Sequence, residues 1–345
     1  MSDVRIEVRE NPGEDWDSFV AGHANAPVYL RSGWCQLARD VFRHRVFFIE
    51  ARADGQLQGV LPVVQQRGVL GNFATSVPFF SYGGALAHGD SVALALMQRA
   101  RELAIGLRCS YLELRDAREY GGEWSVRTDK ASMVLALPDS AEALAKRLGS
   151  KLRSQVKRAD REAVTVRRGG VELLDAFYDV FTRNMRDLGT PVYPARFFRA
   201  ILERFAADTE LVIIDLAGVP AAGGFLVHDR GTTEIPWACC RGDAKPLGVN
   251  MKLYWEVLSA AITRGSHHFD FGRSTIDSGP YKFKQQWGAE PRQLYWHRWE
   301  RRPRAAAVEP AGEGRLRRYA VAVWQRLPLP MANMIGTRIS PGLPW

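Results

Sequence analysis

The sequence has few cysteines and no arrangement of them that would bind a structural metal. Cys35, Cys109, Cys239 and Cys240 are too few and too scattered for a disulfide framework or a CxxC zinc site. The adjacent pair would point to opposite faces of a strand, which argues against joint ligation. We therefore expect reduced, buried thiols and no metal.

Long apolar runs are also missing. No uninterrupted stretch is long enough to cross a bilayer, and the first residues, MSDVRIE, lack the apolar core of a signal peptide. The composition, 46% hydrophobic and 25% charged residues, is that of an ordinary soluble globular protein. We expect the protein to stay in the cytoplasm.

Several catalytic signatures are absent. Asp270-Phe271-Gly272 is not accompanied by a GxGxxG loop or an HRD loop, and there is no GxSxG elbow, HExxH helix or Walker loop. His267-His268 with Asp270 is too closely spaced for the HHxxxD motif of condensing acyltransferases. These absences disfavour kinase, serine-hydrolase, zinc-protease and nucleotide-hydrolase chemistry.

What the sequence does have is positive charge in two places. Residues 145–168 hold nine Lys or Arg and two acids, and residues 301–345 hold eight Arg and two acids, within a net charge of +9. Between 141 and 163, apolar residues recur every three or four positions, which predicts one helix with basic outer faces. Residues 304–314 have the composition of a linker. Residues 315–327 predict a basic amphipathic helix that either lies on an anionic membrane or packs on the protein.

The order of the predicted elements repeats. A helix pair, an antiparallel hairpin, a helix and a strand occur first, within 16–116, and then again within 177–272. The two hairpins begin near Phe47 and Leu211, and the two final strands begin at Tyr111 and His268. This pattern predicts an α+β fold that is duplicated in tandem.

The second of these final strands leads into the most informative stretch. Phe269 and Phe271 alternate with polar residues, which predicts a strand with one buried face. Gly272 ends it, and Ser278-Gly279-Pro280 predicts a turn. Charged and hydroxyl side chains would then gather at the end of one strand, namely those of Arg273, Tyr281, Lys282 and Lys284.

This stretch carries a family resemblance. FDFGRST followed by SGPYKFKQQWG resembles the C-terminal signature of the FemAB-like, acetyltransferase-related transferases, in particular the branch associated with exosortase and PEP-CTERM systems in Gram-negative bacteria. Further matching blocks are KLRSQVKRA, NMRDLGTP and NMKLYWE. The resemblance implies two acyl-CoA N-acyltransferase (GNAT)-like domains of the FemABX type, at 1–140 and 141–300, with a basic linker and tail at 301–345.

The activity that the resemblance implies is transfer of an acyl or aminoacyl group to an amine of a cell-envelope or exopolysaccharide precursor. A lysine just past a strand end suits stabilisation of the oxyanion, and the family places a functional lysine in its FK motif, here at Lys284. Asp270 is the nearest carboxylate to take a proton from the attacking ammonium, or it forms a structural pair with Arg273. Tyr281 offers a hydroxyl to the same site.

Most of the expected acceptor-binding residues follow from the same resemblance, whereas Arg273 and the donor site are expected from the chemistry of the residues themselves. The acceptor would be an anionic small molecule or a lipid- or nucleotide-linked sugar, bound by Arg153, Arg158, Arg183, Asn184, Tyr193, Arg273 and Lys282. The donor would place a pyrophosphate at Gly248 and at the start of a helix capped by Asn250. The Q/RxxGxG fingerprint is absent, so the donor is left open between an acyl-CoA and an aminoacyl-tRNA.

Other functions stay open. The fold could survive without catalysis, as an adaptor that binds membrane or polysaccharide machinery through its two basic surfaces. The transferase could instead be an aminoacyl-tRNA-dependent peptidyltransferase of the peptidoglycan type, or the basic helix could bind tRNA alone, with a steep dependence on salt.

Overall fold

The computed structural model describes residues 4–68, 71–302 and 311–343. The chain folds into two compact units, each described by itself. Unit 1 comprises Met1–Ala131, Arg292–Ala306 and Pro341–Trp345, and unit 2 comprises Ser132–Pro291 and Ala307–Ser340. The boundaries predicted at 140 and 300 therefore shift, because two later segments of the chain return to unit 1.

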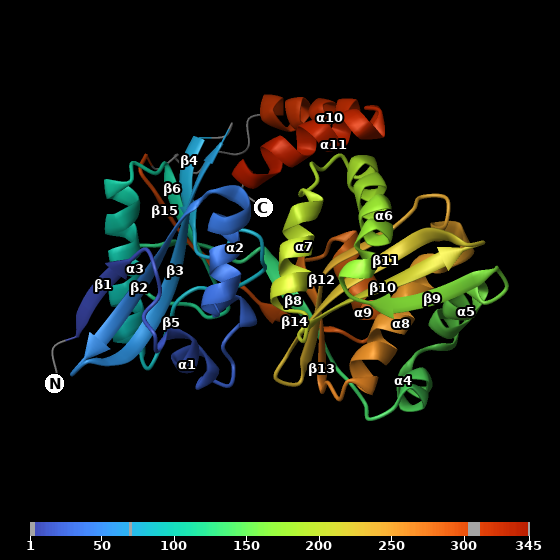
Figure 1. Ribbon diagram of the computed structural model, residues 1–345, viewed down its shortest axis with the longest axis horizontal. Coiled ribbons are helices and arrows are strands. Elements are labelled where there is room, and N and C mark those ends of the chain that lie inside the picture. Colours follow the sequence, from blue (N-terminus) through green and yellow to red (C-terminus); the bar gives the residue numbers. More distant parts are fainter. Residues whose placement is uncertain (1–3, 69–70, 303–310, 344–345) are drawn as a thin grey trace. The chain divides into compact units, whose positions relative to one another are not determined.

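Unit 1 is a twisted sheet with helices on both faces (Figure 1). The sheet order is β1-β2-β3-β4-β6-β15-β7, and β5 pairs with β3. The strands are β1 (Arg5–Arg9), β2 (Arg45–Ala53), β3 (Gln56–Gly68), β4 (Gly71–Thr75), β5 (Leu86–Ala87), β6 (Tyr111–Asp116), β7 (Ser125–Arg127) and β15 (Tyr295–Glu300). The helices are α1 (Trp16–Ala21), α2 (Ser32–Phe42) and α3 (Asp90–Gly106). The predicted hairpin, helix and strand of this half are all confirmed.

Strand β15 was not expected in unit 1. It follows unit 2 in the chain, yet it pairs antiparallel with both β6 and β7. Its His297 is fully buried and donates from Nδ1 to Asp116 Oδ2 at 2.9 Å, while Nε2 accepts from the Tyr120 N–H at 3.1 Å. These bonds hold the returning strand between β6 and the edge strand β7.

Unit 2 is a second sheet, ordered β14-β8-β13-β12-β11-β10-β9. Its strands are β8 (Lys130–Ala136), β9 (Val164–Gly169), β10 (Thr209–Leu216), β11 (Val219–Asp229), β12 (Thr232–Cys240), β13 (His268–Thr275) and β14 (Glu290–Gln293). Its helices include α6 (Leu174–Asp187), α7 (Ala195–Arg204), α8 (Val249–Thr263) and α9 (Gly279–Gln286). The pattern of helix pair, hairpin, helix and strand repeats as predicted.

Two adjacent glycines in β11 let helices approach both faces of this sheet. A Cβ on Gly223 would lie 2.9 Å from the Phe177 ring of α6, and a Cβ on Gly224 would lie 3.1 Å from Val257 of α8. Successive strand residues point to opposite faces. Helices α6 and α8 therefore cover opposite faces of the sheet, as Figure 1 shows.

The single helix expected over 141–163 is two helices, α4 (Ala141–Arg147) and α5 (Ser150–Ala159). Leu148 and Gly149 adopt extended backbone conformations between them. Glycine loses the most conformational freedom in a helix, so the break falls where helix propensity is weakest. The two short helices then both pack on α8.

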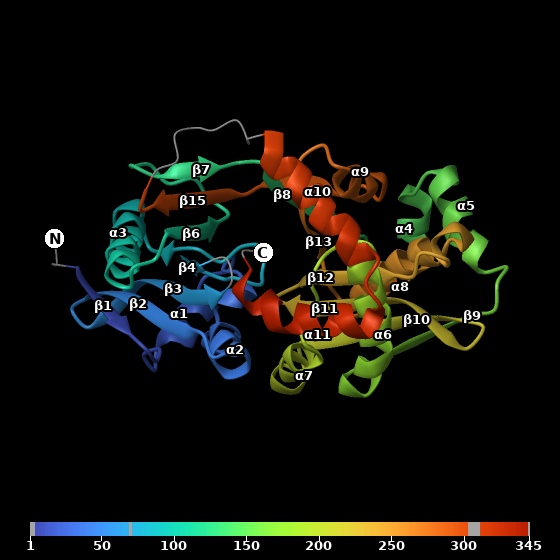
Figure 2. The same cartoon turned by 90° about the horizontal axis from the view of Figure 1, so that it is seen from above.

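The C-terminal region is more ordered than a tail. The basic helix expected at 315–327 is α10 (Ala311–Gln325), and an unpredicted helix, α11 (Leu329–Ile339), follows it. Both lie against α6 (Figure 2). Residues 303–310, most of the expected linker, lie outside the described residues. Within the described ranges, no helix is both long and apolar enough to span a membrane.

Candidate functional site

The centre of the candidate site is a fork between two parallel strands of unit 2. Strands β12 and β13 pair only from Thr232 with His268 to Glu234 with Asp270, although both strands continue beyond this point. Because β13 is central, Asp270 is buried as fully as its Phe neighbours. The expectation that only one face of this strand is buried was therefore wrong.

Helix α9 delivers a lysine to this fork. Ser278 caps the helix by accepting from the Tyr281 N–H at 3.4 Å, and Pro280 occupies its first turn, where a missing N–H costs nothing. The segment expected as a turn is thus a helix start. Tyr281 and Lys284, three residues apart, share the buried face, whereas Lys282 is exposed.

The Lys284 ammonium is held by backbone oxygens. Its Nζ donates to the carbonyls of Gly272 at 2.8 Å and Arg273 at 3.1 Å, and the side chain is only 7% exposed. Successive carbonyls of a regular strand point in opposite directions. Gly272 has a φ of 71°, which bends β13 and lets both carbonyls face one ammonium.

Burial sets the charge state of this lysine. It lowers the pKa of the Lys284 ammonium to about 8, against the opposing effect of the Asp270 and Glu234 carboxylates, which favour the charged form. At neutral pH the side chain is therefore mostly protonated. A protonated lysine has three N–H donors, and two of them are used by the backbone.

Asp270 lies on the other side of the same bend. Its Oδ1 accepts from the Ser132 hydroxyl at 2.6 Å and from the Gly272 N–H at 2.8 Å, all within unit 2. These bonds stabilise the carboxylate and also brace the bend. Ser132, on β8, was missed by sequence reasoning because nothing local to it indicates a partner 138 residues away.

Two buried donors near this centre were also missed. Among the described residues, the Ser274 hydroxyl and the Trp287 indole N–H are buried and have no hydrogen-bond partner. The Tyr281 hydroxyl likewise makes no hydrogen bond within the part of the chain that is described. Buried donors are normally satisfied, so these unpaired groups are exceptions within the folded domain.

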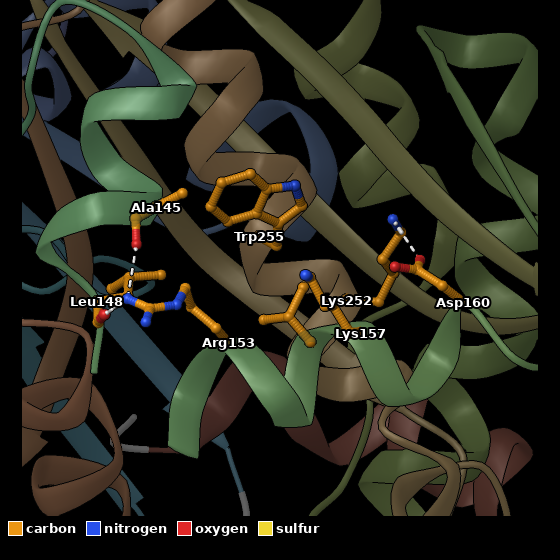
Figure 3. Close-up of a pocket in the computed structure, with 8 residues that line it drawn as sticks. Ala145, Leu148, Arg153, Lys157, Asp160, Lys252 and Trp255 are labelled. Atoms are coloured by element: carbon orange, nitrogen blue, oxygen red, sulfur yellow. Dashed lines mark hydrogen bonds and ion pairs between the residues drawn. The ribbon is translucent and has the colours of Figure 1, made fainter. Parts of the chain in front are cut away.

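A cavity of about 210 Å³ lies in unit 2 between α4, α5 and α8 (Figure 3). Arg153 donates from Nη1 to the carbonyls of Ala145, at 3.3 Å, and Leu148 at the end of α4. Lys252 pairs with Asp160 at 2.9 Å. The remaining lining residues are Val156, Lys157 and Trp255.

This cavity has an aromatic wall and a free cation. In Figure 3 the Trp255 indole and the Lys157 side chain lie close together beside it. Among the described residues, the Lys157 ammonium makes no hydrogen bond or ion pair. An indole and an ammonium together suit an anionic group on an apolar or planar body.

The two residues expected at the donor site, Gly248 and Asn250, have structural roles that differ from those predicted. Gly248, with φ of 82°, is the N-cap residue of α8, so Asn250 lies inside the helix and does not cap it. A Cβ on Gly248 would lie 2.8 Å from the carbonyl oxygen of Gln155 and 3.2 Å from Arg158 of α5. The glycine is thus required by helix packing, and a backbone oxygen faces the start of α8.

Three of the seven expected acceptor-binding residues, Arg183, Asn184 and Tyr193, form a separate group near the end of α6. Arg183 pairs with Asp179 at 3.0 Å, Asn184 is buried, and the Tyr193 ring packs on Phe197. Within the described residues, no hydrogen bond or ion pair joins this group to Lys284. The predicted site residues therefore lie in more than one cluster, although they come from sequence blocks that resemble one family.

Comparison with known proteins agrees with this architecture. Residues 146–285 match the family model described as Acetyltransferase (GNAT) domain. No curated protein matches the chain. FemX is similar in structure, with a TM-score of 0.64 at 14% identity over 84% of this chain and 96% of that one.

Two further solved structures share the fold. One is a tandem GNAT protein from the clavulanic acid biosynthesis pathway, with a TM-score of 0.57 at 12% identity over 88% of this chain and all of that chain. The other is L-PGS from Bacillus licheniformis, with a TM-score of 0.55 at 14% identity over 92% of this chain and 98% of that chain. The chain therefore has the fold of two GNAT-like domains in tandem. The match of residues 146–285 to an acetyltransferase domain agrees with the predicted acyltransferase class for this domain.

Proposed function

We propose that the protein is a FemAB-like N-acyltransferase that transfers an acyl or aminoacyl group to an amine of a cell-envelope or exopolysaccharide precursor. The observation that carries this proposal is the buried Lys284 ammonium at the fork of β12 and β13, inside the matched acetyltransferase domain. The assignment to the exosortase-associated branch and to the cytoplasm is part of the same proposal and is supported by the motifs alone.

The proposed chemistry is direct transfer. The acceptor amine attacks the donor carbonyl carbon, a C–N bond forms, and the C–S or C–O bond to the carrier breaks as the carrier leaves. Negative charge builds on the carbonyl oxygen during attack. The third N–H of Lys284 would stabilise this oxygen in a site of low dielectric, where such a donor is worth about 10²- to 10³-fold in rate.

The attacking nitrogen must also lose a proton. Asp270 is the carboxylate closest in sequence to the bend, and its role would be to take that proton directly or through water. Its bonds to Ser132 and Gly272 fix the orientation of the carboxylate in advance. Tyr281, with its hydroxyl unbonded, would orient the acceptor.

The cavity beside α5 suits the anionic part of the acceptor. Lys157 and Arg153 supply positive charge, and Trp255 supplies a face for an apolar or planar group. An anionic small molecule or a lipid- or nucleotide-linked sugar has this chemistry. Arg158, Arg183, Asn184, Tyr193, Arg273 and Lys282 remain proposed contacts of the same acceptor or of a tRNA.

The packing of α5 bears on the donor. A pyrophosphate at the start of α8 would meet the Gln155 carbonyl oxygen, which repels anions. This observation argues against a pyrophosphate at the start of α8, with Gly248 and Asn250 then serving structure alone, and it leaves the donor open between an acyl-CoA and an aminoacyl-tRNA. It is also compatible with the second candidate, a catalytically silent adaptor. Mass spectrometry of small molecules retained by the purified protein would detect a bound CoA ester and so identify an acyl-CoA as the donor.

The catalytic proposal is tested by acyl-transfer assays on Lys284→Ala, with Gln285→Ala, on the exposed side of α9, as the control variant. We expect kcat to fall about 10²- to 10³-fold for Lys284→Ala and to change less than about threefold for the control. Asp270→Asn keeps the volume of the side chain and should also lose turnover. Undiminished activity in both site variants, with unchanged folding by circular dichroism, would remove these residues from the mechanism.

A further inference from the structure

Helices α10 and α11 expose large apolar side chains to solvent. Tyr319 is 69% exposed, Val323 43%, Met331 46% and Met334 51%. Leu188, at the end of α6 beside α10, is also exposed. Several large apolar residues exposed on two neighbouring helices indicate a binding surface.

The exposure follows from the helical phase and not from loose packing. On α10, Val321 and Trp324 face the body of unit 2, and Tyr319 and Val323 lie on the opposite side at 100° per residue. On α11, Ala332 and Gly336 are buried, and Met331, Met334 and Arg338 share the outer side.

The inner side of the pair is held firmly. A Cβ on Gly189 would lie 2.4 Å from Val321, and a Cβ on Gly336 would lie 2.9 Å from the Val192 N–H nitrogen. The Gln325 side chain donates to the Asp187 carbonyl at 2.8 Å. The outer apolar side chains are therefore presented on helices anchored to α6.

The charge of the segment from Gly314 onward has one sign, although the ion pair of Arg186 with the exposed Asp187 lies beside it at the end of α6. From Gly314 to Trp345 the sequence contains five arginines and no Asp or Glu. Arg318, Arg326 and Arg338 are exposed, and Arg338 donates to the Met334 carbonyl on the same helix. Arginines interleaved with exposed Tyr, Val and Met describe a convex, cationic and apolar surface.

We propose that the outer surface of α10 and α11 binds the headgroup region of a membrane that contains anionic lipids. Two helices with apolar outer sides and arginine-rich flanks fit a bilayer interface, into which the apolar side chains would insert while the arginines bind lipid phosphates. The absence of any acid from Gly314 onward matches an anionic surface by charge. This inference is independent of the acyl-transfer chemistry.

The test is co-sedimentation of the full chain with vesicles of phosphatidylglycerol and phosphatidylcholine, and with vesicles of phosphatidylcholine alone. We expect binding to the anionic vesicles only, weakened by 0.5 M salt because exposed charges are screened. Each arginine near an anionic surface contributes about fivefold in affinity, so Arg318→Gln/Arg326→Gln/Arg338→Gln should bind about 100-fold more weakly.

Apolar insertion is tested separately. Met331→Ser/Met334→Ser should weaken binding, whereas Ile105→Ser/Val219→Ser, which alters equally exposed apolar residues elsewhere, should not. Equal binding to neutral vesicles, or no binding to anionic ones, would overturn the proposal. So would self-association of the wild-type chain that Met331→Ser/Met334→Ser abolishes without any effect on vesicles, since the surface would then bind a second copy.

Discussion

We expect the free energy of unfolding to rise at alkaline pH because of the buried Lys284 ammonium, and we expect Lys284→Met to remove this rise. The ordinary pKa of lysine is 10.5, and burial lowers that of Lys284 to about 8. At about 1.36 kcal/mol per pKa unit, keeping the proton in the folded state costs about 3 kcal/mol. Below pH 8 both the folded and unfolded states are protonated, so the whole cost is present.

The sign of the effect follows from proton binding. Between pH 8 and 10.5 the folded protein releases the Lys284 proton while the unfolded chain keeps it, so the cost disappears as the pH rises. The neutral amine still donates to the Gly272 and Arg273 carbonyls. Lys284→Met has no buried charge and so lacks this penalty at every pH. It leaves two buried carbonyls without a hydrogen-bond partner, which destabilises the folded state by about 1–3 kcal/mol for each carbonyl.

We therefore expect wild type to gain about 3 kcal/mol relative to Lys284→Met between pH 7 and pH 10.5. Urea unfolding followed by tryptophan fluorescence measures both proteins at each pH, and their difference cancels the titration of all other groups. Lys282→Met, at the exposed neighbouring position, should show no such change. A wild-type gain below about 1 kcal/mol would refute the assignment of a buried, charged Lys284.

Two further predictions concern packing in unit 2. Gly248→Ala should reduce the free energy of unfolding by about 2–4 kcal/mol in urea titrations, because the new Cβ meets both a positive φ and the Gln155 carbonyl. The control Gly265→Ala has a similar φ of 84° but no atom within 4 Å of its Cβ, so it should cost only about 1 kcal/mol. Equal losses in the two variants would contradict the tight packing of α5. Ser132→Ala should lower the free energy of unfolding by about 1–3 kcal/mol, because it removes a hydrogen-bond donor from the buried Asp270 carboxylate. If Ser132→Ala is equally destabilising in an Asp270→Asn background, this hydrogen bond is not the cause of the loss.

Much of the fold could be predicted because its signals are local. The periodicity of β6 and of the β2–β3 and β10–β11 hairpins is set by neighbouring residues, and these elements lie where the pattern places them. The course of β15 could not be predicted, because its partners β6 and β7 lie far away in sequence. The break between α4 and α5 falls at Gly149, where helix propensity is weakest, but the continuous apolar stripe favoured a single helix.

The site was predictable to a similar degree. The choice of Lys284 over Lys282 followed from a family motif, and the helical phase of α9 agrees with it by burying Lys284 alone. Its partners were not predictable, because they are main-chain carbonyls exposed by the bend at Gly272. The role of Gly248 was predicted as anion binding, yet contact with α5 explains this residue without a ligand.

The position of β15 also constrains how the chain can be made. Asp116 and His297, which bond to each other inside unit 1, are separated by 181 positions. While a ribosome is still synthesising the residues between them, β6 and β7 have emerged without the strand that joins them. The sheet of the N-terminal half therefore stays incomplete until the later half has been translated, and nascent chains at that stage have an unpaired sheet edge.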